Sequence, residues 1–246
     1  MKKNQLKELN YSQSKIDGFD IEVAQKTRIL LIGAGGIGGH VLLGLIRKGY
    51  RFITNLDSDV VDLRNCSRQL FSKRDIGKLK VYTLAENILP HGLFPSTINA
   101  IPLRLQETQE QGMDFSKYDV IIVCVDNDIA RVASANIGLK YGIPVVVGAL
   151  SGDGNEIALW LQESKPHTPC FVCLQPDAFN NKRYPCEGGI IDVLQIVSGF
   201  MVYCVDTLLC GRSRDWNYRH ITLNGIMPDT KQMVKQRKDC LLCKGQ

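Results

Sequence analysis

Apolar and polar positions along the chain follow two patterns, one typical of strands and the other of helices. Short uninterrupted apolar runs predict strands buried on both faces of a parallel sheet, at 28–33, 52–56, 97–103, 119–125 and 145–147. Between them, apolar residues recur at helical spacing, which predicts helices over 36–48, 78–90 and about 128–141. Strands and helices in this succession imply a parallel sheet with right-handed crossovers.

The pattern changes after Gly152. The later residues predict a strand, a long loop, a long apolar helix and two short antiparallel strands, at 156–161, 164–187, 190–209, 218–223 and 232–234. We find no internal repeat. The predicted fold class is α/β: a Rossmann-like, mostly parallel sheet with helices on both faces, extended by antiparallel strands.

Glycines follow the first apolar run at once. Gly33, Gly35 and Gly38 fit the G-x-G-x-x-G pattern of a nucleotide-binding turn, and Gly36 lies among them. Glycine is needed because the turn is tight and the backbone must approach a phosphate without a Cβ in the way. The next helix directs free N–H groups and its positive dipole end at that phosphate. Asp57 ends the second strand, where an acidic residue binds ribose hydroxyls. Glycines and acid together do not separate NAD from ATP.

The polar loop after Asp57 holds residues that distinguish the two ligands. Arg68 and Lys80 can neutralise a triphosphate and the charge on leaving pyrophosphate, which an NAD dehydrogenase does not need. Asp126 ends the fourth strand and can hold Mg²⁺, which prefers carboxylate and phosphate oxygens. The alternative is that Arg68 and Lys80 are surface charges and that Asp126 caps the following helix. Taken together, the residues favour ATP.

Four segments occur in a characteristic order: Asp57-Ser58-Asp59-Val60, Asn65-Cys66-Ser67-Arg68-Gln69, Gly77-Lys78-Leu79-Lys80 and Cys124-Val125-Asp126-Asn127. They resemble the ubiquitin-activating-enzyme superfamily, above all its bacterial ThiF/MoeB/HesA-type members, over about residues 28–243. The resemblance implies an enzyme that uses MgATP to adenylate the C-terminal carboxylate of a small ubiquitin-like protein. It also implies a homodimer.

The resemblance assigns roles to individual positions. It places ribose at Asp57 and Mg²⁺ at Asp126. The phosphates would be lined by Asn65, Arg68, Gln69 and Lys80, and we include Asp59 and Asn127 in the nucleotide site. Many relatives carry an N-terminal arginine that reaches the ATP of the other subunit. Here 10–15 contains no arginine, so either Lys15 replaces it or the contact is absent.

Two C-x-x-C pairs predict a metal site. Each pair can place two thiolates on one metal, and both together complete a tetrahedral site of Cys170, Cys173, Cys240 and Cys243. Full thiolate coordination leaves no open position, so we expect a structural Zn²⁺ that ties the long loop to the C-terminal segment. The resembled family commonly has this site. The alternative is four buried or loose cysteines.

Cys186 lies just before the long apolar helix, in Tyr184-Pro185-Cys186-Glu187-Gly188-Gly189. A helix N-terminus lowers the pKa of a cysteine because the dipole favours the thiolate. In the resembled family a cysteine on this crossover loop can attack the acyl-adenylate or be persulfidated, though some members do not need it. We expect a covalent role, and the alternative is a loop thiol without one. Packed contexts indicate core positions for the others, Cys66, Cys124, Cys204 and Cys210.

Composition adds limits rather than a function. The net charge is +5, but the lysines and arginines are scattered, which argues against nucleic acid as a partner. No secretory signal and no membrane span are expected, so we expect a cytoplasmic location. Nine cysteines is a high count for such a chain, and in a reducing compartment they favour metal ligands, a nucleophile or buried positions over disulfides. We expect one adenylation domain over 1–246, with a helical segment at 1–24, a nucleotide-binding half at 25–150 and a partner-binding half at 151–246.

The sequence therefore predicts an ATP-dependent adenylyltransferase with ATP, Mg²⁺ and Zn²⁺ as ligands. Its acyl substrate is expected to be a small ubiquitin-like protein, with transfer to a cysteine as a second step. Adenylation of a peptide is the nearest alternative. Adenylation of a small molecule or of a tRNA-bound carboxylate is the second, and the lack of a basic patch argues against tRNA. From a different class, a non-catalytic nucleotide-binding scaffold or an NAD-linked reductase stays open. The acyl acceptor is not identified.

Overall fold

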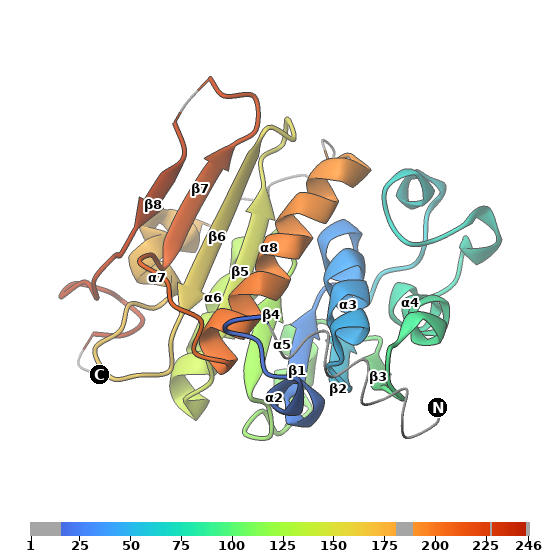
Figure 1. The fold of residues 1–246 in the computed structure, drawn as a ribbon, viewed down its shortest axis with the longest axis horizontal. Coiled ribbons are helices and arrows are strands. Elements are labelled where there is room, and N and C mark those ends of the chain that lie inside the picture. The colour runs from blue at the N-terminus through green and yellow to red at the C-terminus, as the bar shows by residue number, and fades with distance from the viewer. Residues whose placement is uncertain (1–15, 181–188, 227, 245–246) are drawn as a thin grey trace.

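A single sheet organises the part of the chain that the structure describes. The structure, a computed structural model, describes residues 16–180, 189–226 and 228–244. The strand order is β3-β2-β1-β4-β5-β6-β7-β8, and the pairs within β3-β2-β1-β4-β5 are parallel, whereas the later pairs are antiparallel (Figure 1). This confirms the predicted architecture. The bounds are β1 (Arg28–Ile32), β2 (Phe52–Leu56), β3 (Thr97–Ile101), β4 (Val120–Val123), β5 (Val145–Leu150), β6 (Glu156–Gln162), β7 (Tyr218–Thr222) and β8 (Thr230–Gln232).

Helices cover both faces of the sheet. Along β1, Ile29 and Leu31 are buried in one core with residues of α3 and α8, and Leu30 and Ile32 in the other with residues of α5 and α6. In Figure 1, α3 and α8 cross the front of the sheet. The bounds are α2 (Ile21–Lys26), α3 (Gly36–Lys48), α4 (Lys80–Ile88), α5 (Leu105–Glu110), α6 (Asp128–Tyr141), α7 (Phe171–Leu174) and α8 (Ile191–Leu209).

The two helices next to the nucleotide motifs match the sequence prediction because their end signals are local. α3 begins after Gly35 and ends at Gly49, which has a left-handed φ of 104°. α6 begins where the side chain of Asn127 accepts a hydrogen bond from the N–H of Ala130, and it ends at Gly142, also left-handed. Each end signal therefore fixes the helix boundary without help from the rest of the fold.

Several other boundaries differ from the prediction. α5 lies in a stretch where no helix is predicted, and its first turn is closed by a bond from Arg104 N to the Glu107 carboxylate. The predicted loop at 164–187 contains α7 and a 3₁₀ turn at Pro176–Asn180. The helix expected from residue 78 begins at Lys80, because Leu79 first forms an isolated bridge with Val60. β5 extends to Leu150 because it pairs with β6 along its whole length.

No apolar segment of membrane-spanning length was predicted, yet α8 has that length and composition. By length and composition it is long and apolar enough, with 19 residues and 56% of its apolar window buried. It packs on α3 and on β5, and Leu194, Val197 and Met201 are fully buried. The apolar character of α8 is that of a central core helix with neighbours on two sides.

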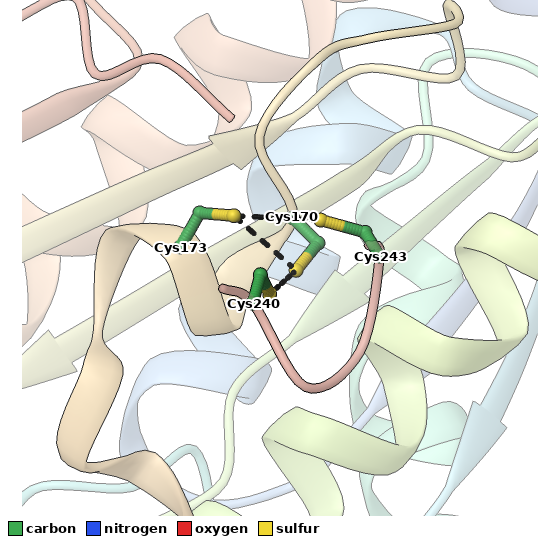
Figure 2. Close-up of side chains that lie close together, drawn as sticks. All are labelled: Cys170, Cys173, Cys240 and Cys243. Atoms are coloured by element: carbon green, nitrogen blue, oxygen red, sulfur yellow. Dashed lines mark hydrogen bonds between the residues drawn. The ribbon is translucent and has the colours of Figure 1, made fainter. Parts of the chain in front are cut away.

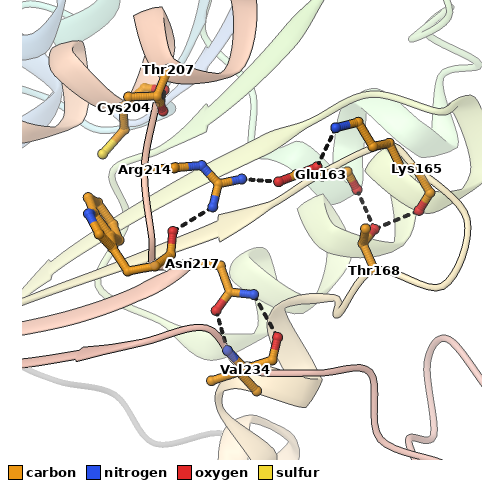
Figure 3. Close-up of polar contacts among 9 residues, drawn as sticks. Glu163, Lys165, Thr168, Cys204, Thr207, Arg214, Asn217 and Val234 are labelled. Atoms are coloured by element: carbon orange, nitrogen blue, oxygen red, sulfur yellow. Dashed lines mark hydrogen bonds and ion pairs between the residues drawn. The ribbon is translucent and has the colours of Figure 1, made fainter. Parts of the chain in front are cut away.

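A polar network holds the antiparallel extension together (Figure 3). The side chain of Asn217 donates to the carbonyl of Val234 and accepts from its N–H, both at 2.7 Å. Arg214 pairs with Glu163 and donates to the carbonyl of Trp216. Glu163 precedes Cys170, and Val234 precedes Cys240. The network therefore fixes both cysteine-bearing segments at the end of β6.

Candidate functional site

The glycine turn at 33–38 brings α3 unusually close to the sheet. A Cβ on Gly38 would lie 2.1 Å from the carbonyl oxygen of Gly33, and one on Gly33 would lie 2.7 Å from that of Cys124. Gly36 is packed on Leu194 of α8. Gly35 is different, since the nearest atom to a Cβ there is the side-chain nitrogen of Gln69 at 3.9 Å. The turn is therefore closely packed at Gly33, Gly36 and Gly38. It is open at Gly35, as a phosphate-binding backbone requires.

Asp57 ties the end of β2 to this turn. Its carboxylate accepts a 2.7 Å hydrogen bond from Ala34 N–H and a 2.8 Å bond from Asp59 N–H. Burial raises the pKa of Asp57, and these two N–H groups and nearby Lys80 oppose the increase. The predicted ribose ligand is thus also part of the support of the glycine turn.

Lys80 extends the site from Asp57. Its amine lies 2.9 Å from the carboxylate of Asp59, and the side chain of Lys80 is 9% exposed, whereas that of Asp59 is 61% exposed. This burial contradicts the interpretation of Lys80 as a surface charge. A buried amine beside an exposed carboxylate can exchange that partner for a phosphate oxygen at little desolvation cost.

The segment after β2 folds back onto the turn. Its 3₁₀ turn, Leu63–Ser67, is closed by Asp62 and Asn65, whose side-chain oxygen accepts from Asp62 N at 2.8 Å. Arg68 is half-buried and donates to the carbonyl of Arg64. His40 of α3 belongs to no sequence motif, yet its buried ring bonds to the Arg68 backbone. Burial lowers the pKa of His40, and Arg68 partly opposes the decrease.

Asp126 follows the end of β4 and lies close to the glycine turn that follows β1. Cys124 N–H donates to Ile32 O at 2.8 Å, which places the residues after β4 beside Gly33. Asp126 is exposed, and the cap of α6 is Asn127. The alternative in which Asp126 caps the helix is therefore wrong. Asn127 serves at least this structural purpose, and Asp126 presents its carboxylate at the carboxyl edge of the sheet.

The predicted nucleotide residues thus come together around one feature. The glycine turn is hydrogen-bonded to the carboxylate of Asp57, which also accepts from Asp59 N–H. The side chain of Asp59 in turn pairs with Lys80. Gln69 lies beside Gly35, and the turn that carries Asp126 lies beside Gly33. These residues lie at the carboxyl ends of the parallel strands, where the strand order reverses between β1 and β4, which is the usual position of ligands in such sheets. A nucleotide with a phosphate at Gly35 and a hard cation at Asp126 fits this donor set.

The four predicted metal ligands also come together (Figure 2). The sulfur atoms of Cys170, Cys173, Cys240 and Cys243 all lie within 4.8 Å of one another, with Cys170–Cys240 at 3.5 Å and Cys173–Cys243 at 3.4 Å. Tetrahedral zinc with bonds of about 2.3 Å would separate its sulfurs by about 3.8 Å. All four are buried. The cluster therefore has the residues and the spacing of a closed metal site.

Backbone N–H groups support thiolates in this cluster. Arg237 N–H donates to the sulfur of Cys173 at 3.3 Å. Burial by itself raises the pKa of Cys240, but N–H groups of Cys243 and Leu242 reverse the effect and lower it. Burial raises the pKa of Cys170. A bound cation would remove that penalty, because metals bind the deprotonated thiol.

Two predicted residues lie outside the described part of the chain, Cys186 and Lys15. Of the four cysteines expected in the core, Cys204 is fully buried, and Cys66, Cys124 and Cys210 are partly buried.

Comparison with known proteins identifies the family. The model of the ThiF family matches residues 10–243. The chain belongs to the ThiF family. It is 32% identical over 233 residues to the adenylyltransferase and sulfurtransferase UBA4 of Saccharomyces cerevisiae, covering 89% of this chain and 51% of that protein. It is 29% identical to SUMO-activating enzyme subunit 2 of Dictyostelium discoideum, over 66% of this chain and 24% of that protein. The chain spans about half the length, or less, of these curated ThiF relatives.

The fold has solved counterparts. The crystal structure of E. coli MccB with ATP superposes with a TM-score of 0.74, covering 91% of this chain and 68% of that one. The sequence identity of 19% means that this likeness supports the ThiF-family fold alone.

The close contact at Gly38 predicts an intolerant position. Gly38→Ala forces a Cβ against the Gly33 carbonyl, which is backbone and cannot rotate away. We therefore expect the free energy of unfolding to fall by about 1–3 kcal/mol or more. Thermal unfolding of the purified variant measures it, as a lower Tm. The matched control is Gly199→Ala within α8, where nothing lies within 4 Å of the new Cβ. There the substitution should leave Tm unchanged or raise it slightly. Equal Tm values for the two variants would contradict the geometry.

Proposed function

We propose that this chain uses ATP to adenylate the C-terminal carboxylate of a small protein or peptide. The observation that carries the proposal is the buried amine of Lys80, which is connected through Asp59 and Asp57 to the glycine turn. A dinucleotide needs only a pyrophosphate turn and an acid for ribose. A buried cation next to that turn suits a longer, more highly charged phosphate chain.

Each residue has a defined part in the proposed reaction. The turn at Gly35 and the N-terminus of α3 receive a phosphate, and Asp57 accepts from ribose. Arg68 and Lys80 balance the charge of the outer phosphates. Asp126 would hold Mg²⁺, which would neutralise phosphate oxygens when bound. Asn65, Gln69 and Asn127 shape the surrounding backbone, as their hydrogen bonds indicate.

The chemistry needs little from the protein beyond position and charge. A carboxylate oxygen of the acyl substrate attacks the α-phosphorus of ATP, forming a P–O bond. The bond from the α-phosphorus to the bridging oxygen breaks, and pyrophosphate leaves with the electron pair. The products are acyl-AMP and pyrophosphate. Arg68 and Lys80 stabilise the charge that develops on pyrophosphate.

Relatives favour a ubiquitin-like protein as the acyl substrate. The name SUMO-activating enzyme points to a ubiquitin-like substrate for that relative, and UBA4 is named as an adenylyltransferase and sulfurtransferase. The structural likeness to MccB, which has been solved with ATP and with MccA, keeps a peptide as the second candidate. We further propose a homodimer, as the resemblance implies.

The cysteine cluster is proposed to bind Zn²⁺. Four thiolates fill a tetrahedral shell, which leaves no position for substrate, so the metal would be structural. It would join α7 to the segment after β8, and the cluster packs on Val132 and Leu139 of α6.

ATP–pyrophosphate exchange tests the proposed reaction. With small ubiquitin-like proteins or peptides that have a free C-terminus, the wild-type chain should catalyse exchange. Asp126→Ala should reduce it by about a hundredfold or more, because a charge-stabilising group is lost. Asp153→Ala is the control, an exposed aspartate whose carboxylate accepts hydrogen bonds within its own turn, from Ser151 and Asn155. Absence of exchange with every such substrate, together with tight NAD binding, would refute the proposal in favour of a reductase; ATP binding without exchange would indicate a scaffold.

Cys186 is proposed to accept the acyl group after adenylation. The thiolate would attack the acyl carbon and release AMP, forming a thioester. Cys186→Ala should therefore keep pyrophosphate exchange at the wild-type rate and abolish the thiol-sensitive acyl-enzyme seen by mass spectrometry. Cys66→Ala serves as the control and should retain the adduct. If Cys186→Ala also loses exchange, the residue belongs to the nucleotide site and not to a later step.

Metal analysis tests the cluster. The purified chain should hold one zinc per chain, and Cys240→Ser should reduce the content and lower Tm by about 5–10 °C, since each kcal/mol is worth roughly 2–4 °C at this size. Cys210→Ser, outside the cluster, should retain both zinc and Tm. A metal-free wild-type chain with the same Tm before and after strong chelation would show that the cysteines pack without a metal.

A further inference from the structure

A buried ion pair lies directly behind the turn that carries Asp126. Asp128 and Arg131 belong to the first turns of α6 and are 1% and 4% exposed. Arg131 Nη1 lies 3.0 Å from Asp128 Oδ1, and Arg131 Nη2 donates to the carbonyl of Val125 at 2.9 Å. One guanidinium therefore joins the start of the helix to the residue before Asp126.

This pair is poorly explained by the stability of α6. The positive end of the helix dipole favours the carboxylate of Asp128 in the first turn but disfavours the guanidinium of Arg131, so the dipole does not account for the pair. Taking both charges out of water is also costly, and such pairs can often be replaced by apolar residues without loss of stability. In addition, Asp128 Oδ2 is buried without a hydrogen-bond partner among the described residues. What the arrangement does achieve is a fixed position for the Val125 carbonyl.

The backbone on both sides of Asp126 is held by separate contacts. Before it, Cys124 N–H bonds to Ile32 O at 2.8 Å, and Val125 O is bonded to Arg131. After it, the side chain of Asn127 accepts from Ala130 N–H at 2.9 Å. Asp126 itself is exposed at the carboxyl edge of the sheet. Its carboxylate therefore projects from a backbone that is fixed at each neighbouring residue.

We propose that Asp128 and Arg131 are a positioning pair, which holds Asp126 where it can bind the divalent cation of a nucleotide. The inference rests on the proposed function. Neither residue contacts the nucleotide in this proposal: Arg131 acts through Val125, and Asp128 acts by orienting Arg131. The two-pronged guanidinium matters because it reaches the carboxylate and the carbonyl at once, which the single amine of a lysine does not do in a fixed geometry.

The metal-dependent gain in ATP affinity tests the pair. Calorimetry gives the dissociation constant of ATP in EDTA and in excess Mg²⁺, and the ratio of the two isolates the contribution of the cation. The test variant combines Asp128→Leu with Arg131→Met, which removes both charges together and so leaves neither one buried alone. We expect this variant to keep its Tm within a few degrees and its metal-free ATP affinity. Its ratio of dissociation constants should fall about tenfold below the wild-type ratio. Arg131→Lys should lower the ratio by less.

A control uses an ion pair far from Asp126, at the C-terminal end of α3, in which only the carboxylate is fully buried. Lys48→Met with Asp206→Asn removes the pair between α3 and α8, where Asp206 is fully buried. It should change Tm and leave the ratio as in wild type. The proposal is overturned if the folded Asp128/Arg131 variant keeps the wild-type ratio, or if it loses metal-free and metal-bound affinity equally. A wild-type chain that binds no ATP refutes the proposed function itself, and faster hydrogen exchange of 124–128 in the nucleotide-free variant would still support the positioning pair.

Discussion

The close approach of Gly38 to the carbonyl of Gly33 is the constraint on which the rest of the site depends. A Cβ there would lie 2.1 Å from that oxygen, so any other residue would push α3 away from the sheet. With α3 in place, its N-terminus faces the ends of β2 and β4, and the Ala34 N–H reaches the carboxylate of Asp57. The glycine turn and the carboxylate of Asp57, which we propose bind phosphate and ribose, are thus positioned by this one helix-to-strand contact.

Local signals explain how much of the fold could be predicted. α3 and α6 were placed correctly because Gly49, Asn127 and Gly142 end or begin them through their own backbone preferences. Boundaries set by a distant partner were not accessible. β5 extends to Leu150 only because β6 returns beside it, and Lys80 begins α4 only because Leu79 pairs with Val60 first. α8 resembles a membrane span in composition because both α3 and the sheet contact it.

The site shows the same division between local and distant causes. Residue types and spacing predicted which side chains meet, including the four cysteines and the group around the glycine turn. They did not predict that Lys80 is buried against an exposed partner, or that Asn127 and not Asp126 caps α6. Burial and pairing depend on the whole fold. The Asp128–Arg131 spacing of three residues was visible in the sequence, but on a helix it equally describes an exposed surface pair.

The distribution of charge decides between the ligands that the glycine turn allows. Asp57 alone would suit NAD or ATP, since both present ribose hydroxyls. A buried lysine amine is costly unless an anion lies beside it, and Asp59 provides that anion from an exposed position. A ligand with three phosphates could form an ion pair with the Lys80 amine. A nicotinamide dinucleotide has two phosphates, and both would bind at the glycine turn. The arrangement therefore suits the triphosphate of the proposed reaction better than a dinucleotide.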